Sequence, residues 1–212
     1  MIYLVSGYRR SGTSAMMRAL IAGGLKAVRD GELEFRGNAP DSTGYKPNPG
    51  GLYEIGRNFW RQPPFLAALR NGLVYKAFFD ILPNLPARSC EYAVVFMRRD
   101  PAEIRLSLER TRAYLVDRGI IGVSPLHWPF DVYRDYDQRC IDMVLGICQQ
   151  RRDVRLMEVD YAELVADPLR TLSRVGAFFE LPDFGLEAAA EVIDPELYRY
   201  HAGACTEAKT GL

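Results

Sequence analysis

The residues whose side chains are best suited to binding or catalysis lie in a short loop near the N-terminus, which is bounded by two glycines. The basic and hydroxyl side chains of this loop, with the glycine that ends it, are Arg9, Arg10, Ser11, Gly12, Thr13 and Ser14. The apolar residues 2–6 before the loop predict a buried strand, and residues 13–22 after it predict a helix. Glycines let backbone N–H groups converge on a ligand, a helix N-terminus favours negative charge, and Arg10 adds a permanent cation. The loop is therefore predicted to bind phosphate or sulfate.

The spacing of Gly7 and Gly12 is that of the nucleotide-binding P-loop motif GxxxxGK(S/T), and Ser14 fits the last position of that motif. Thr13, however, occupies the position of the lysine that reaches the β- and γ-phosphates of a nucleoside triphosphate. The missing lysine disfavours ordinary hydrolysis of ATP or GTP. The cation of this loop lies instead at Arg10, inside the turn.

A second candidate anion site combines Arg99 and Ser107. Residues 92–97 are apolar throughout, as in a central parallel strand, and Arg99 follows them. Pro101 suits the first position of a helix that Asp100 caps. Ser107 lies eight residues after Arg99, just over two helical turns, so its side chain can face back toward the end of the strand. The pair could hold a phosphate at the corner between strand and helix.

Together these segments resemble the PAPS-dependent sulfotransferases, in particular the bacterial and protein-tyrosine sulfotransferase branches; PAPS is 3′-phosphoadenosine 5′-phosphosulfate. Residues 10–14 are similar to the family's loop for the 5′-phosphosulfate, with Arg9 in place of a usual Pro and Ser14 in place of a Thr. Arg99 and Ser107 are similar to its motif for the 3′-phosphate. The resemblance covers nearly the whole chain and implies PAPS as co-substrate, with no metal.

Two further positions are carried over from the same resemblance. Tyr161, in the segment Tyr-Ala-Glu-Leu after the last predicted strand, matches a tyrosine that contacts the adenosine part of the donor. Many family members complete the 3′-phosphate site with a C-terminal Arg-Lys-Gly segment, which this chain lacks. Arg199 is the candidate substitute.

The resemblance also implies the catalytic groups. Arg10 and Lys76 are the cations expected near the leaving phosphate. In cytosolic members the strand with this lysine ends in Lys-x-His and the histidine is the base, but here Phe78 stands at that position. In the tyrosine-type enzymes a glutamate from a segment after the first helix is the base, and Glu54 is the matching first candidate, with Asp80 second.

Strand-like and helix-like segments alternate along the chain, which favours a parallel sheet covered on both faces. We expect an α/β, P-loop-like three-layer fold with a central, mainly parallel sheet flanked by helices, as one domain over residues 1–212. Residues 30–62 are rich in Gly and Pro and predict an irregular segment. Further strands are expected at 73–78 and 154–159, and further helices at 64–70, 101–118, 131–150, 161–166, 168–180 and 186–192.

Two long helices have apolar residues at helical spacing, which predicts their buried faces. On the helix at 101–118 these residues are Ile104, Leu108, Thr111 and Leu115. On the helix at 131–150 they are Val132, Tyr136, Cys140, Met143 and Ile147.

Composition limits the partners. The 27 basic and 27 acidic residues give a formal net charge of +0, so no overall field attracts nucleic acid or an anionic membrane. The four cysteines form no CxxC pair, the N-terminus has no basic segment of a signal peptide, and no apolar run approaches a membrane span, all of which favour a cytoplasmic protein. We expect a small-molecule, carbohydrate or peptide acceptor, no nucleic acid and no membrane.

Two alternatives stay open. A P-loop kinase or NTPase would need Mg²⁺ and an acidic ligand after a strand, for which Asp100 or Asp160 could serve. A non-catalytic sulfotransferase-fold binding protein would explain the missing histidine and the missing C-terminal segment.

Overall fold

Five parallel strands form the centre of the protein in the computed structural model. The strands are β1 (Ile2–Gly7), β2 (Lys26–Ala27), β3 (Leu73–Lys76), β4 (Tyr92–Arg98) and β5 (Val154–Asp160). Their order across the sheet is β2-β3-β1-β4-β5, and every pair is parallel. The structure describes residues 1–28, 40, 42–46, 48, 51, 53, 55, 59–87, 91–119 and 130–199, and of residues 130–137 the backbone only.

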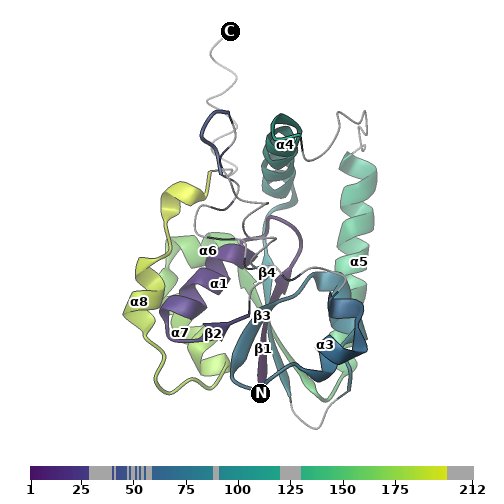
Figure 1. Ribbon diagram of the computed structural model, residues 1–212, viewed down its shortest axis with the longest axis vertical. Coiled ribbons are helices and arrows are strands. Elements are labelled where there is room, and N and C mark those ends of the chain that lie inside the picture. The colour runs from purple at the N-terminus through teal and green to yellow at the C-terminus, as the bar shows by residue number, and fades with distance from the viewer. Residues whose placement is uncertain are drawn as a thin grey trace.

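Helices cover both faces of this sheet, which confirms the α/β class and the three layers (Figure 1). On one face lie α1 (Thr13–Ala22), α6 (Tyr161–Ala166), α7 (Pro168–Phe178) and α8 (Leu186–Glu191). On the other face lie α3 (Pro63–Ala67), α5 (Phe130–Gln150) and the 3₁₀ helix η2 (Phe79–Asn84). The helix α4 (Pro101–Asp117) extends beyond the carboxyl ends of the strands, and short 3₁₀ helices occupy Phe59–Arg61 and Pro195–Leu197.

Each face of the sheet has its own apolar core. The core under α1 includes Met16, Met17 and Leu20, whose side chains are fully buried. The core under α5 includes Leu145 and Cys148. Because strand side chains alternate between the two faces, the sheet contributes to both cores.

Local signals fix the ends of the elements that carry the site. The Asp100 side chain accepts hydrogen bonds from the backbone N–H groups of Ala102 (2.7 Å) and Glu103 (3.3 Å), so it caps α4 as expected. At the C-terminal end of α1, Gly24 has a φ of 107° and the Leu25 N–H donates to the Leu20 carbonyl over 3.0 Å. This left-handed residue ends α1 where the paired glycines predict.

The predicted buried faces of the two long helices agree with the structure only in part. Ile104 of α4 is buried as expected, whereas the side chains of Val132 and Tyr136 lie outside the described ones. Over residues 138–150 of α5, where side chains are described, the buried ones are Ile141, Val144, Leu145 and Cys148. Met143 and Ile147, expected inside, are 60% and 37% exposed. The polar side chains Glu103 and Ser107 are buried on α4, whereas Leu108 and Leu115 are only partly buried.

Among the described helices, none has the length and apolar character that crossing a bilayer would require.

Candidate anion-binding site

The carboxyl ends of the parallel strands meet at one edge, and the predicted functional residues follow four of them. The glycine-bounded loop follows β1, Lys76 ends β3, Arg99 follows β4, and Tyr161 follows β5. The strand β1 lies between β3 and β4, so the chain leaves β1 toward one side of the sheet and later returns on the other. Such a switch in strand order is where open α/β sheets bind ligands.

The loop after β1 is a compact turn with positive φ at several residues. Gly7 and Gly12 have φ values of 150° and 96°, and Arg10 has 66°. The backbone N–H and the hydroxyl of Ser11 both donate to the carbonyl of Tyr8, over 3.2 Å and 2.7 Å. A Cβ on Gly12 would lie 2.4 Å from the Tyr161 ring, so only glycine fits there. Alternating backbone conformations of this kind build anion-binding concavities.

Lys76 supplies a buried cation beside the first turn of α1. Its side chain is 8% exposed, and Nζ donates to Ser14 Oγ over 3.0 Å. Ser14 occupies the hydroxyl position of the P-loop spacing. The cation that is missing at Thr13 is thus provided in space by the neighbouring strand.

The two predicted anion-binding segments touch each other. Arg10 Nε donates to Ser107 Oγ over 2.9 Å, and Arg10 Nη1 donates to Asn48 Oδ1 over 3.3 Å. Arg99 Nη1 donates to the carbonyl oxygen of Arg10 over 3.0 Å. Arg10 therefore contacts both Ser107 and Arg99, an arrangement that the eight-residue spacing of Arg99 and Ser107 did not predict.

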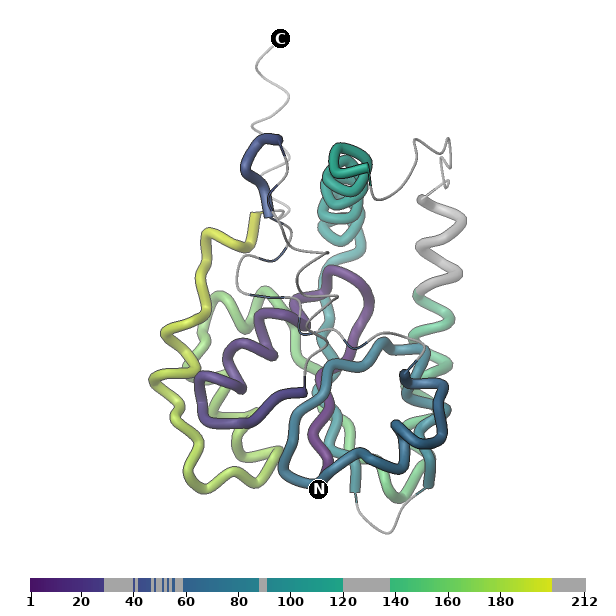
Figure 2. The backbone as a smooth tube through the Cα atoms, viewed as in Figure 1, coloured from purple at the N-terminus to yellow at the C-terminus, as the bar shows by residue number. Residues whose placement is uncertain are grey.

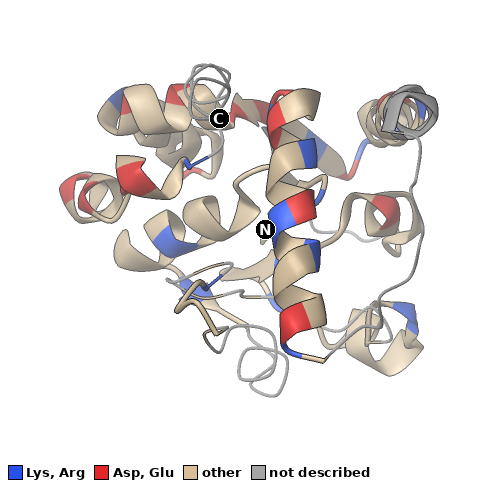
Figure 3. Ribbon diagram, turned by 90° about the horizontal axis from the view of Figure 1, so that it is seen from above, with Lys and Arg blue, Asp and Glu red and all other residues tan. Residues whose placement is uncertain are grey.

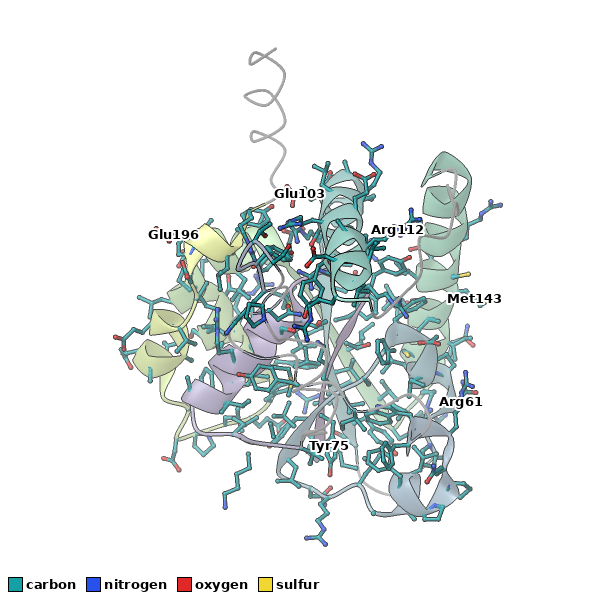
Figure 4. All side chains as sticks on the ribbon, turned by 45° about the horizontal axis from the view of Figure 1, so that its top comes forward. Arg61, Tyr75, Glu103, Arg112, Met143 and Glu196 are labelled. Carbon is teal, nitrogen blue, oxygen red and sulfur yellow. The ribbon has the colours of Figure 1, made fainter. Side chains whose placement is uncertain are left out.

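Two residues that the sequence did not single out complete this cluster. Glu103 Oε2 accepts from Arg99 Nε over 3.0 Å, and the hydroxyl of Tyr198 lies 2.9 Å and 2.7 Å from the two oxygens of Glu103. Glu103 belongs to α4 and is labelled beside this helix in Figure 4, and its contact with Tyr198 joins α4 to the C-terminal residues. The four-residue separation of Arg99 and Glu103 at the start of a helix was a usable signal. Nothing local in the sequence links Tyr198 to them.

Tyr161 also belongs to this cluster, since its ring lies 5.1 Å from the Arg99 guanidinium, and both Tyr161 and Tyr198 keep their protons at neutral pH. Burial raises the pKa of Tyr161 above the ordinary value of 10.0, although Arg99 acts in the opposite direction. Burial first, and then the hydrogen bond to the Glu103 carboxylate, raise the pKa of Tyr198 well above its ordinary value. The Tyr198 hydroxyl is consequently a hydrogen-bond donor to a carboxylate.

Arg199 lies at the outer side of the site, with the segment at residues 42–46. Its Nη2 donates to the Lys46 carbonyl over 3.3 Å, and its guanidinium lies 4.7 Å from the centre of the Tyr45 ring. Arg110 of α4 lies 4.3 Å from the same ring. Figure 2 shows residues 42–46 beside the end of the described chain, at the side of the molecule where α4 lies. The role of Arg199 toward a ligand stays a prediction.

The remaining predicted residues are placed as follows. Ser11 and Thr13 are buried in the loop and at the first position of α1, whereas the Arg9 side chain is exposed. Phe78 is partly buried just beyond β3, and Asp80 lies in η2. Glu54 lies outside the described residues. Seen from above in Figure 3, acidic as well as basic residues line α4.

The fold and the site define an α/β protein with a compact, glycine-bounded loop at the carboxyl edge of a parallel sheet. Solved structures similar to it are sulfotransferase domains. They include the domain from the curacin biosynthetic pathway (16% identity, TM-score 0.49, 98% of this chain and 96% of that one). A second is sulfotransferase STF1 from Mycobacterium tuberculosis (16% identity, TM-score 0.47, 100% of this chain and 76% of that one). A third is the sulfotransferase domain of the Synechococcus olefin synthase (17% identity, TM-score 0.43, 99% of this chain and 93% of that one).

No family model matches the sequence, and no curated protein matches it. At these identities and TM-scores, the structural likeness assigns neither an activity nor a ligand to this chain. Its chemistry has to be argued from its own residues.

Proposed function

We propose that this chain is a sulfotransferase that moves a sulfuryl group from PAPS to an acceptor hydroxyl or amine and releases adenosine 3′,5′-bisphosphate. The observation that carries the proposal is the contact between two basic segments far apart in the sequence. Arg10 Nε donates to Ser107 Oγ over 2.9 Å across 97 residues, and Arg99 donates to the Arg10 carbonyl. Two adjoining anion-binding segments suit a ligand with two separate anionic groups, as PAPS has.

The residues present fit such a ligand. Ser11, Thr13 and Ser14 would hold the 5′-phosphosulfate in the compact turn, where the left-handed conformation of Gly12 leaves the backbone accessible. Arg99 and Ser107 would hold the 3′-phosphate. Bound PAPS supplies the sulfuryl group. The protein's own residues bind and orient the PAPS molecule and neutralise its negative charge.

The cations of the site are suited to stabilise a leaving phosphate. By analogy with phosphoryl transfer, the protein contributes mainly positioning and fixed positive charge. Lys76 is buried beside Ser14, where its charge is screened less than it would be in water. Phe78 cannot accept the acceptor's proton, so we keep Glu54 as the proposed base, with Asp80 second.

The contact between Lys76 and Ser14 also favours a second candidate. It returns a lysine to the neighbourhood of a P-loop hydroxyl, as a kinase or NTPase would require. Such an enzyme would bind ATP with Mg²⁺ in preference to a bisphosphate. A non-catalytic protein of this fold would bind the bisphosphate and transfer nothing.

A thermal-shift comparison of adenosine 3′,5′-bisphosphate with ATP plus Mg²⁺ separates these functions. A ligand at 100 times its Kd stabilises by about 2.7 kcal/mol, which for a chain of this size raises Tm by about 5–10 °C. We expect this shift with the bisphosphate alone. A shift with ATP and Mg²⁺ alone would contradict the proposal, and so would the absence of any shift. Release of bisphosphate from PAPS with a panel of hydroxyl and amine acceptors then distinguishes the enzyme from a binding protein.

A matched pair of variants connects the shift to this site. Ser107→Ala removes the hydroxyl that contacts Arg10. It should weaken binding of the bisphosphate about tenfold, since hydrogen bonds to charged groups are stronger than those between neutral groups. Ser173→Ala makes the same change on the exposed surface of α7 and should leave affinity unchanged. Equal affinity in both variants would show that the ligand binds elsewhere.

A further inference from the structure

A buried ion pair between Arg99 and Glu103 lies beside the glycine-bounded loop that follows β1. Each side chain is 6% exposed, and Arg99 Nε donates to Glu103 Oε2 over 3.0 Å. Arg99 Nη1 donates at the same time to the carbonyl of Arg10 over 3.0 Å. Two acceptors on different elements therefore hold one guanidinium from two directions.

Tyr198 holds the carboxylate of this pair. Its hydroxyl lies within 2.9 Å of both Glu103 oxygens. The guanidinium of Arg99 lies 5.0 Å from the centre of the Tyr198 ring and 5.1 Å from that of Tyr161, and these two rings meet edge to face at 5.0 Å. The C-terminal segment thus reaches the end of β4 through direct contacts, which fix both members of the ion pair.

Glu103 could have either of two effects on an anionic ligand, and these effects have opposite signs. As a negative charge in a site for anions, it lowers the local positive potential, so that its neutralisation would strengthen binding. As the group that orients Arg99, Glu103 fixes the orientation of the guanidinium, so that neutralisation of Glu103 would weaken binding. The bonds of Arg99 to the Arg10 carbonyl and of Tyr198 to both carboxylate oxygens favour the second effect, because they specify an orientation and add no charge.

We propose that Glu103 is a positioning residue for Arg99 and that Tyr198 acts through it, so that the C-terminal segment around Tyr198 is a working part of the anion site. The identity of the ligand rests on the proposed function. The positioning itself rests only on the contacts among Arg99, Glu103, Tyr198 and the Arg10 carbonyl.

Calorimetric titration with adenosine 3′,5′-bisphosphate and with inorganic pyrophosphate tests the effect on binding. Glu103→Gln should weaken binding about tenfold although it removes a negative charge, and Tyr198→Phe should weaken it about fivefold with no change of charge. The double variant should be within about twofold of Glu103→Gln, since Tyr198 acts through Glu103. Tighter binding in Glu103→Gln, or unchanged binding in Tyr198→Phe, would overturn the proposal.

The matched controls lie away from the ion pair. Glu109→Gln makes the same charge change at an exposed position of α4, and Tyr3→Phe removes the same hydroxyl from a ring that packs on Phe179. Neither should alter affinity by more than about twofold. Loss of a partner from a buried ion pair can destabilise a protein, so Tyr198→Phe, which keeps both charges, is the decisive variant if Glu103→Gln folds poorly.

A measurement without ligand keeps this test separate from that of the proposed function. The Nε–H of Arg99 should give one sharp signal in a ¹H–¹⁵N spectrum, assigned by its loss in Arg99→Lys. We expect this signal to shift and broaden in Glu103→Gln and Tyr198→Phe, and to persist in both controls. If the wild-type protein binds neither probe, the proposed function fails, while the spectra still decide the positioning. An unchanged Arg99 signal in Tyr198→Phe refutes the positioning whatever the protein binds.

Discussion

Gly12 carries two constraints at once, because its backbone is left-handed and its α-carbon lies against Tyr161. An added Cβ would stand 2.4 Å from that ring, and φ is 96°. Gly12→Ala should therefore lower the free energy of unfolding by more than the roughly 1–2 kcal/mol that a left-handed alanine costs, and displace Tyr161. We expect a lower denaturant midpoint together with loss of bisphosphate binding.

Gly24→Ala separates the strain from the clash. Gly24 also has a positive φ, 107°, but an added Cβ would meet nothing within 4 Å. This variant should lose only about 1–2 kcal/mol and bind the bisphosphate like the wild type. If the two alanine variants behave alike, close packing of Tyr161 on Gly12 does not matter to the site.

The start of α4 is the element whose local capping bears most directly on the site. Asp100 accepts from the N–H of Glu103, so the cap orders the turn that carries this carboxylate. Asp100→Ala should cost about 1 kcal/mol and lower Tm by about 2–4 °C. It should also weaken bisphosphate binding a fewfold, because the first turn of α4 positions Glu103.

Asp167→Ala is the matched comparison for that prediction. Asp167 caps α7, and its side chain accepts from the Arg170 N–H over 3.1 Å. The stability loss should be similar, with affinity unchanged when measured by titration well below Tm. An equal loss of affinity in both variants would mean that general destabilisation, and not the α4 turn, accounts for the effect.

The sequence predicted the elements better than their buried faces. The bounds of α1 and α6 agree with prediction, because glycine, proline and aspartate act locally at element ends. On α5, two overlapping stripes of apolar residues have helical spacing, and only tertiary packing chooses between them. On α4 the apolar pattern misled, because the helix faces a polar site and buries Glu103 and Ser107.

The sequence predicted those site residues that local spacing or the family resemblance indicates. It did not predict contacts between segments that lie far apart in the chain. The loop at residues 9–14 and Arg99 follow strands whose ends the pattern located. The contact of Ser107 with Arg10 spans 97 residues, and that of Tyr198 with Glu103 spans 95. Only the folded chain brings these residues together, and no periodicity in the sequence encodes them.

At the scale of the whole molecule, one sheet separates two apolar cores and contributes side chains to both. Met16, Leu20 and Val175 belong to the core under α1, and Leu145 and Cys148 to the core under α5. Because alternate residues of β1 and β4 face opposite cores, loss of one core should disturb the sheet and with it the other. We therefore expect the two layers to unfold together.

The reactivity of Cys148 reports whether they do. Its side chain is 0% exposed, and burial raises its pKa above 9.0, so the native thiol should resist alkylation at pH 8. In a background in which Cys90, Cys140 and Cys205 are all replaced by serine, labelling of Cys148 should occur only from the unfolded state. Leu20→Ala on the opposite face costs about 2–5 kcal/mol and should speed this labelling by about 30- to 4,000-fold.

Met143→Ala is the control, since it truncates a side chain of α5 that is 60% exposed, and it should leave the labelling rate nearly unchanged. If unfolding is cooperative, a cavity beneath α1 should raise the labelling rate of Cys148 beneath α5, although no side chain of α1 belongs to the core under α5. If Leu20→Ala lowers the denaturant midpoint but leaves the labelling of Cys148 unchanged, α5 opens by itself. Loss of one core would then have little effect on the other, and binding of the proposed ligand at the glycine-bounded loop should protect the α1 layer alone.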